Sequence, residues 1–170
     1  MKKILLAVVV AFTALAANAQ DGKFTVWYGA NMADASCDGD VDSEFKFINV
    51  GVDYTAPIND TFDWTAGLSY VTKGVKEWSP GFLQVDANAA WKFFNSDDVN
   101  LSVLTGPYAG YMIVKDDAGD ATLDFGWQAG VKAEYKQFSL KVGYEFGFTD
   151  VIKDVKSKNR NLYIRVGYSF

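Results

Sequence analysis

The most constraining feature of the sequence is an alternation of apolar and polar residues with a period of two, which recurs from Phe24 to Phe170. Successive side chains of a β-strand point to opposite faces, so each such segment predicts a strand with one apolar and one polar face. The pattern predicts an all-β protein of eight strands, over residues 24–30, 45–54, 62–70, 83–93, 99–114, 123–135, 138–148 and 162–170.

The connections between these strands alternate in length. Long connections are expected at residues 32–44, 73–81, 115–121 and 149–159, and short ones at 56–60, 95–98 and 136–137. An even number of antiparallel strands, with short turns at one end and longer loops at the other, is typical of an up-and-down transmembrane β-barrel. Pro107 does not fit a strand that is paired on both sides, because it lacks an N–H, and it predicts a bulge or break there.

The apolar face decides which way such a barrel is turned. It carries sixteen aromatic rings: Tyr54, Phe62, Trp64, Tyr70, Trp91, Phe93, Tyr111, Phe125, Trp127, Tyr135, Phe138, Tyr144, Phe146, Phe148, Tyr168 and Phe170. The interior of an eight-stranded barrel is too narrow for so many rings. With strand direction alternated, the rings also separate into two girdles around an aliphatic band, which favours an outward, lipid-facing surface. The alternative is a soluble lipocalin-like barrel with its apolar face inside.

The N-terminus has the layout of a secretory signal peptide. Lys2 and Lys3 precede an apolar run over residues 4–15, and small residues lead to Ala19. We therefore expect residues 1–19 to be a signal peptide cleaved after Ala19, and residues 20–170 to form the barrel domain. No later stretch is apolar for long enough to be a transmembrane helix, so any membrane span must consist of strands.

Taken together, these features resemble the small outer-membrane β-barrel families, including the OmpA-type transmembrane domain, OmpX and the barrel-domain proteins common in Bacteroidota. The resemblance covers the whole mature chain and includes its last strand, which ends in Tyr168, Ser169 and Phe170. It implies a location in the bacterial outer membrane, in contact with lipid. It also implies that Tyr168 and Phe170 are an assembly signal read by the barrel-assembly machinery.

The polar face predicts a charged lumen. Its ionisable residues are Asp63, Asp86, Lys92, Asp124, Lys132, Glu134, Lys141, Glu145 and Arg165. Buried charges must be paired or hydrated, so we expect a network that plugs the barrel. The alternative is a narrow porin-like conduit for ions or small solutes, with gaps at four small residues, Gly126, Gly130, Gly143 and Gly167.

No catalytic or cofactor site is expected. The chain has no His, and no nucleophile with an adjacent base is evident. An acidic net charge of −5 argues against nucleic-acid binding. Asp38, Asp40, Asp42 and Glu44 give a weak calcium candidate, but Ser43 and Val50 break the EF-hand pattern, so a solvated acidic loop is favoured.

Cys37 lies alone in the same loop. It is either an exposed thiol or a site of intermolecular pairing, and its lack of an activating neighbour favours the first. The sequence thus predicts a non-enzymatic outer-membrane protein with a structural or surface-interaction role. Its long loops would meet an extracellular ligand or a host surface.

Overall fold

The computed structural model describes residues 22–36, 44–73, 80–114, 123–152 and 155–170. These residues form eight strands: β1 (Lys23–Ser36), β2 (Glu44–Pro57), β3 (Phe62–Thr72), β4 (Gly81–Asn95), β5 (Val99–Val114), β6 (Leu123–Tyr135), β7 (Phe138–Ile152) and β8 (Val155–Ser169). All eight predicted strands are therefore confirmed. No helix in the described part of the chain is long and apolar enough to cross a membrane.

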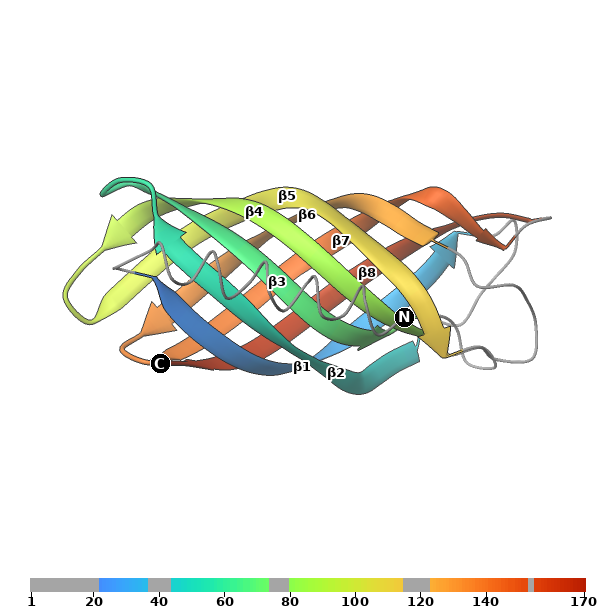
Figure 1. Cartoon of the computed structure of the whole chain (residues 1–170), viewed down its shortest axis with the longest axis horizontal. Coiled ribbons are helices and arrows are strands. Elements are labelled where there is room, and N and C mark those ends of the chain that lie inside the picture. Colours follow the sequence, from blue (N-terminus) through green and yellow to red (C-terminus); the bar gives the residue numbers. More distant parts are fainter. Residues whose placement is uncertain (1–21, 37–43, 74–79, 115–122, 153–154) are drawn as a thin grey trace, which may run out of the picture.

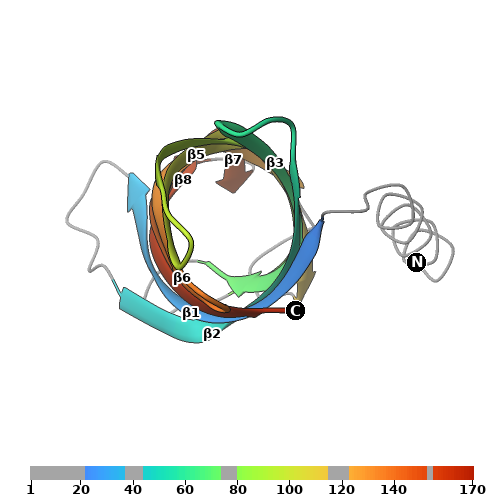
Figure 2. The same cartoon turned by 90° about the vertical axis from the view of Figure 1, so that its left-hand side faces the viewer.

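The strands form one closed antiparallel barrel in the order β1 to β8 (Figures 1 and 2). The barrel closes because β1 pairs with β8, from Thr25↔Ser169 to Ser36↔Lys158. The β2–β3, β4–β5 and β6–β7 turns lie at one end, hereafter the short-turn end, together with the C-terminal Phe170 (Figure 1). The opposite end is the long-loop end.

Strands extend further toward the long-loop end than the sequence predicted. The long connection expected over residues 149–159 is wrong, because β7 continues to Ile152 and β8 begins at Val155. β1 likewise continues to Ser36, inside the connection expected over residues 32–44. The alternation of polarity ends before the strands do, since backbone pairing holds a hairpin together even where no apolar layer sorts its two faces.

A bulge interrupts β2 at its long-loop end. Between the pairs Gly29↔Asn49 and Asn31↔Lys46, two β2 residues lie opposite one β1 residue. Phe47 and Ile48 are these two residues, and both are exposed, at 61% and 64%. A bulge of this kind breaks the period of two, which explains why the sequence pattern is irregular here.

Of the bulge or break expected at Pro107, the structure shows a break in the β4–β5 ladder and no bulge. The β4–β5 register is the same on both sides of it, at Asp86↔Tyr108 and Ala89↔Thr105, but the ladder skips the pairs between them. On the other side Pro107 stays in register with Trp127 of β6. Gly106 allows this close approach, because a side chain there would meet the Ala87 carbonyl oxygen.

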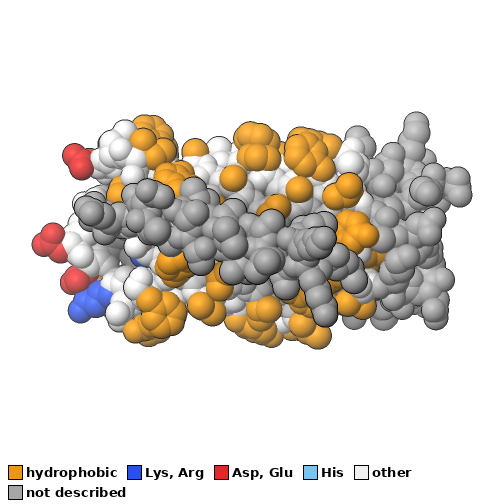
Figure 3. Space-filling view, in the orientation of Figure 1, with side chains coloured by type: hydrophobic (Ala, Val, Ile, Leu, Met, Phe, Trp, Pro, Cys, Tyr) orange, Lys and Arg blue, Asp and Glu red, His pale blue; other side chains and the backbone are white. Residues whose placement is uncertain are grey.

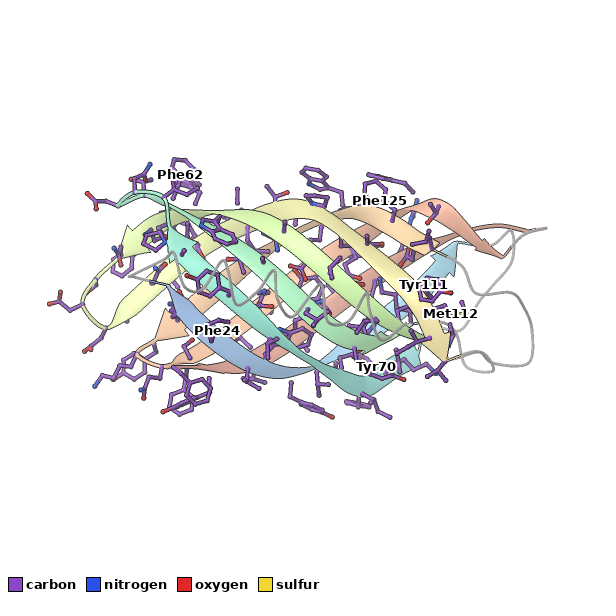
Figure 4. The ribbon with its side chains drawn as sticks, viewed as in Figure 1. Phe24, Phe62, Tyr70, Tyr111, Met112 and Phe125 are labelled. Carbon is purple, nitrogen blue, oxygen red and sulfur yellow. The ribbon has the colours of Figure 1, made fainter. Side chains whose placement is uncertain are left out.

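The outer surface carries the aromatic residues, as predicted. Figure 3 shows hydrophobic side chains spread over the visible wall, with charged ones at the short-turn end. Phe24 and Phe62 lie toward that end, and Tyr70, Tyr111 and Phe125 toward the other (Figure 4). The predicted rings are exposed or half-exposed, except for Tyr54, which is 1% exposed and packs against the rings of Phe24 and Trp64. The soluble alternative, with its apolar face inside, is wrong.

The outward aliphatic band gives a direct test. Val131 lies midway along β6 between Trp127 and Tyr135 and is half-exposed. We expect Val131→Arg to lower the free energy of unfolding in lipid vesicles by about 2–4 kcal/mol, because a charge would enter the middle of the bilayer. Val131→Leu, the matched control, should change it by less than about 0.5 kcal/mol. Urea titration followed by tryptophan fluorescence measures both, and equal stabilities would contradict the outward placement.

Candidate functional site: the charged lumen

The lumen is filled by the side chains that alternate with the outward ones. Of the nine charged residues that the sequence assigned to it, eight are buried and Lys92 is half-buried near the short-turn end. Seven ion pairs join charged groups among the described residues. The interior is therefore a set of connected ion pairs and hydrogen bonds.

Glu145 is the centre of the cluster nearer the long-loop end. Its carboxylate lies 2.9 Å from Lys73 Nζ and 3.1 Å from Arg165 Nη2, and it is fully buried. Gln84 Nε2 and Asn161 Nδ2 donate hydrogen bonds to the same carboxylate, at 2.9 and 3.1 Å. Because β4, β7, β8 and the residue that follows β3 all contribute, one carboxylate ties several walls of the barrel together.

Lys73 reaches this cluster from the residue that follows β3. Its ammonium group donates to Asp124 Oδ2 at 2.9 Å and lies 4.3 Å from the centre of the Tyr108 ring. Only 1% of its side chain is exposed. The start of the β3–β4 connection is thus anchored inside the barrel rather than outside it.

A second group of ion pairs lies nearer the short-turn end. Lys141 Nζ donates to Asp53 Oδ2 at 2.6 Å, and Trp27 Nε1 donates to Asp53 Oδ1 at 2.9 Å. Glu134 Oε1 lies 2.7 Å from Lys23 Nζ and 3.2 Å from Lys132 Nζ. These contacts fix the inner faces of β1, β2, β6 and β7 relative to one another.

Two further carboxylates complete the lumen. Lys92 Nζ donates to Asp63 Oδ1 at 2.8 Å beside the short-turn end. Asp86 forms no ion pair in the described part of the chain: Asn88 Nδ2 donates to its Oδ2 at 2.6 Å, and its Oδ1 has no partner. Asp63 is thus held by a charge-assisted hydrogen bond, whereas Asp86 accepts only from a neutral amide.

Sequence reasoning missed three members of these clusters, Asp53, Lys73 and Lys23. Asp53 lies between the apolar residues Val52 and Tyr54, on a strand whose alternating pattern is interrupted by the β2 bulge. Its inward direction could therefore be inferred only from its two neighbours and not from the strand as a whole. Lys73 was assigned to a long loop, and Lys23 precedes the first residue of the predicted strand. A charged residue at the edge of a periodic segment carries no signal of which way it points.

Large rings occupy the space predicted to be open. A side chain added at Gly126 would meet Tyr108, and one added at Gly143 or Gly130 would meet the Tyr163 hydroxyl. A side chain added at Gly167 would meet Ser139 and Thr25. The gaps expected over these four glycines are therefore absent, and the argument for a conduit that rested on them is wrong.

A small cavity lies among the charged residues. It has a volume of about 10 Å³ and is lined by Thr25, Trp27, Asp53, Lys132, Ser139, Lys141, Arg165 and Gly167. A cavity of this size holds about one water-sized particle. It is far too small to be a path along the barrel.

The other candidate sites lie mostly outside the described residues. This applies to Cys37, Asp38, Asp40 and Asp42, while Glu44 begins β2. In the part of the chain that the structure describes, no group of three His, Cys, Asp or Glu residues could hold a metal ion. The calcium and thiol assignments remain predictions.

Comparisons with known proteins agree with this architecture. The family model described as outer membrane protein beta-barrel domain matches residues 4–170. Neisserial surface protein A is similar in structure, with a TM-score of 0.57, 17% identity and coverage of 86% of this chain and 97% of that one. No curated protein matches the sequence.

Two further solved structures show the same fold. Ail of Yersinia pestis, in complex with the heparin analogue sucrose octasulfate, has a TM-score of 0.54, 17% identity and coverage of 89% of this chain and 100% of that one. The N-terminal β-barrel domain of Pseudomonas aeruginosa OprF has a TM-score of 0.51, 11% identity and coverage of 88% and 100%. At these identities the likeness shows the fold.

The two kinds of buried carboxylate give opposite expectations for the same substitution. We expect Glu145→Gln to lower the free energy of unfolding by about 3–5 kcal/mol, because Lys73 and Arg165 lose a buried counter-charge. Asp86→Asn, the matched control, should leave stability within about 1 kcal/mol of the parent or raise it, since no cation is abandoned. Urea unfolding in the same vesicles compares them; a larger loss in Asp86→Asn would refute the assignment of Glu145 as the central carboxylate.

Proposed function

The chain belongs to the outer membrane protein beta-barrel domain family, and from this premise we propose that it is a non-enzymatic, surface-interacting protein with a closed lumen. It is a β-barrel of the bacterial outer membrane, embedded in lipid. The observation that carries the proposal is the buried charge network centred on Glu145, which crosses the lumen from several strands. A barrel filled in this way holds its loops in place but conducts little.

The proposal places the contacts with other molecules at the long-loop end. Paired strands there continue to Ser36 and Ile152, beyond the end of the alternating pattern. Neisserial surface protein A is a surface protein by name, and Ail binds a heparin analogue. These likenesses support a role in which the connections at this end contact an extracellular ligand or a host surface.

The narrow conduit is the second candidate, and conductance separates the two. We expect the purified barrel to give no steady single-channel steps in planar bilayers, because rings and ion pairs occupy the lumen. A porin of known conductance is the positive control.

Loop replacement tests the surface role. Replacing residues 74–79 or 115–122 with short Gly-Ser links should leave folding intact but reduce adhesion or complement resistance. Reproducible steps would favour the conduit, and unchanged surface phenotypes would contradict the surface role.

Export gives an independent expectation. We propose that residues 1–19 are removed after Ala19, so mass spectrometry of the outer-membrane fraction should find a mature chain that starts at Gln20. Ala19→Leu should retain the longer chain, because the cleavage site requires a small residue. On gels the parent should migrate differently with and without boiling. An uncleaved parent of full mass would contradict the proposal.

The end of β8 is proposed as the signal for the barrel-assembly machinery. Phe170 is 75% exposed, its N–H donates to the Phe24 carbonyl oxygen at 2.8 Å, and its ring packs against Tyr168. We expect Phe170→Ser to reduce the amount of folded barrel in the outer membrane several-fold. Phe148→Ser removes another exposed ring, from β7, and serves as the control. An equal loss in both variants would indicate general destabilisation instead of a signal.

A further inference from the structure

Three cations stand side by side on one inner wall of the barrel. Lys132 of β6 is the cross-strand partner of Lys141 of β7, and Lys141 is the partner of Arg165 of β8. All three are buried. Like charges placed directly opposite each other on neighbouring strands are destabilising, so this row requires compensation.

The carboxylates around the row compensate for it only in part. Lys132 Nζ lies 3.2 Å from Glu134 Oε1, and Lys141 Nζ lies 2.6 Å from Asp53 Oδ2. Each ammonium group carries three donors, so most of their hydrogen-bonding capacity is unused by these pairs. Arg165 Nη2 reaches Glu145, but its Nη1 is buried without an acceptor. Arg165 therefore presents an unused guanidinium donor beside two ammonium groups that have donors to spare.

The cavity of about 10 Å³ lies where these three side chains converge. Asp53 is the one carboxylate that lines it, and both of its oxygens already accept hydrogen bonds, from Trp27 and Lys141. The Thr25 hydroxyl is bonded to Ser169. A water molecule placed there could direct its two hydrogens only at the Ser139 hydroxyl and the remaining lone pairs of Asp53, whereas an anion accepts from the surrounding cations directly.

We propose that this cavity is a binding site for one small monovalent anion of chloride size, held by Lys132, Lys141 and Arg165. Its volume of about 10 Å³ leaves room for a single small particle. Lys132 and Ser139 lie close to the β6–β7 turn, so the anion enters from the short-turn end. The site neutralises the row of cations and adds to the stability of the closed lumen, independently of what the loops bind.

Chloride dependence of stability tests the site. A ligand that binds the folded state raises stability with its concentration. At constant ionic strength, we expect the urea midpoint of the micelle-bound barrel to rise as chloride replaces gluconate from about 1 to 100 mM. Lys132→Met should abolish this rise and still fold, because Glu134 keeps Lys23 at 2.7 Å. Lys92→Met removes a lumen cation that does not line the cavity, so it should retain the rise.

Crystals grown in bromide supply the second readout. A single anomalous peak between Lys132, Lys141 and Arg165 would establish the site. Midpoints that are the same in chloride and gluconate, or a dependence that survives Lys132→Met, would overturn the proposal. Density without an anomalous signal would show that the cavity holds water only, which would also overturn it.

Discussion

Closure of the backbone ladder is the constraint on which the rest of the structure depends. In hydrocarbon no water can satisfy an unpaired N–H or C=O, so a strand-built span must have no open edge. The β1–β8 pairing, from Thr25↔Ser169 outward, meets this requirement. Once the ring of strands is closed, the period of two assigns each residue to the wall or the lumen. A shift of one residue in any pair would exchange the two faces of that strand.

The narrow lumen follows from the same closure. Eight strands leave room for side chains and little else, so charges on one strand meet counter-charges from strands far away in sequence. Lys141 pairs with Asp53, 88 positions away, and Gln84 donates to Glu145, 61 positions away. Glycines accommodate the largest rings, since Tyr163 occupies the space that side chains at Gly130 and Gly143 would need. The packing of side chains in the lumen and the pairing of its charges thus depend on each other.

The sequence predicted the parts of this arrangement that depend on periodicity. The bounds of β6, Leu123–Tyr135, match the expected range, because apolar and polar residues alternate along its whole length. The expectation failed where another effect replaced that alternation. A bulge hides the β2 pattern near Phe47, and the outer part of β7 is held by pairing with β8 beyond the periodic segment.

The ion pairs themselves were beyond sequence reasoning. Periodicity places Glu145 and Arg165 on the inner face, but it does not reveal that Lys73 turns into the barrel to join them. That contact depends on the path of the chain just after β3 and on the height of Glu145 across the lumen, both of which are set by strand register. Most of the lumen charges could therefore be predicted, while three further charges and the partners of all of them could not.

A filled lumen also determines where the protein can vary in function. Substituting a buried partner of Glu145 leaves other charges without compensation, so the interior tolerates little change. At the long-loop end, β1 and β7 are still paired with β8 at Ser36 and Ile152, so the barrel is already held together where these strands end. One scaffold can then present different surfaces, which is why we propose a surface role for the long-loop end.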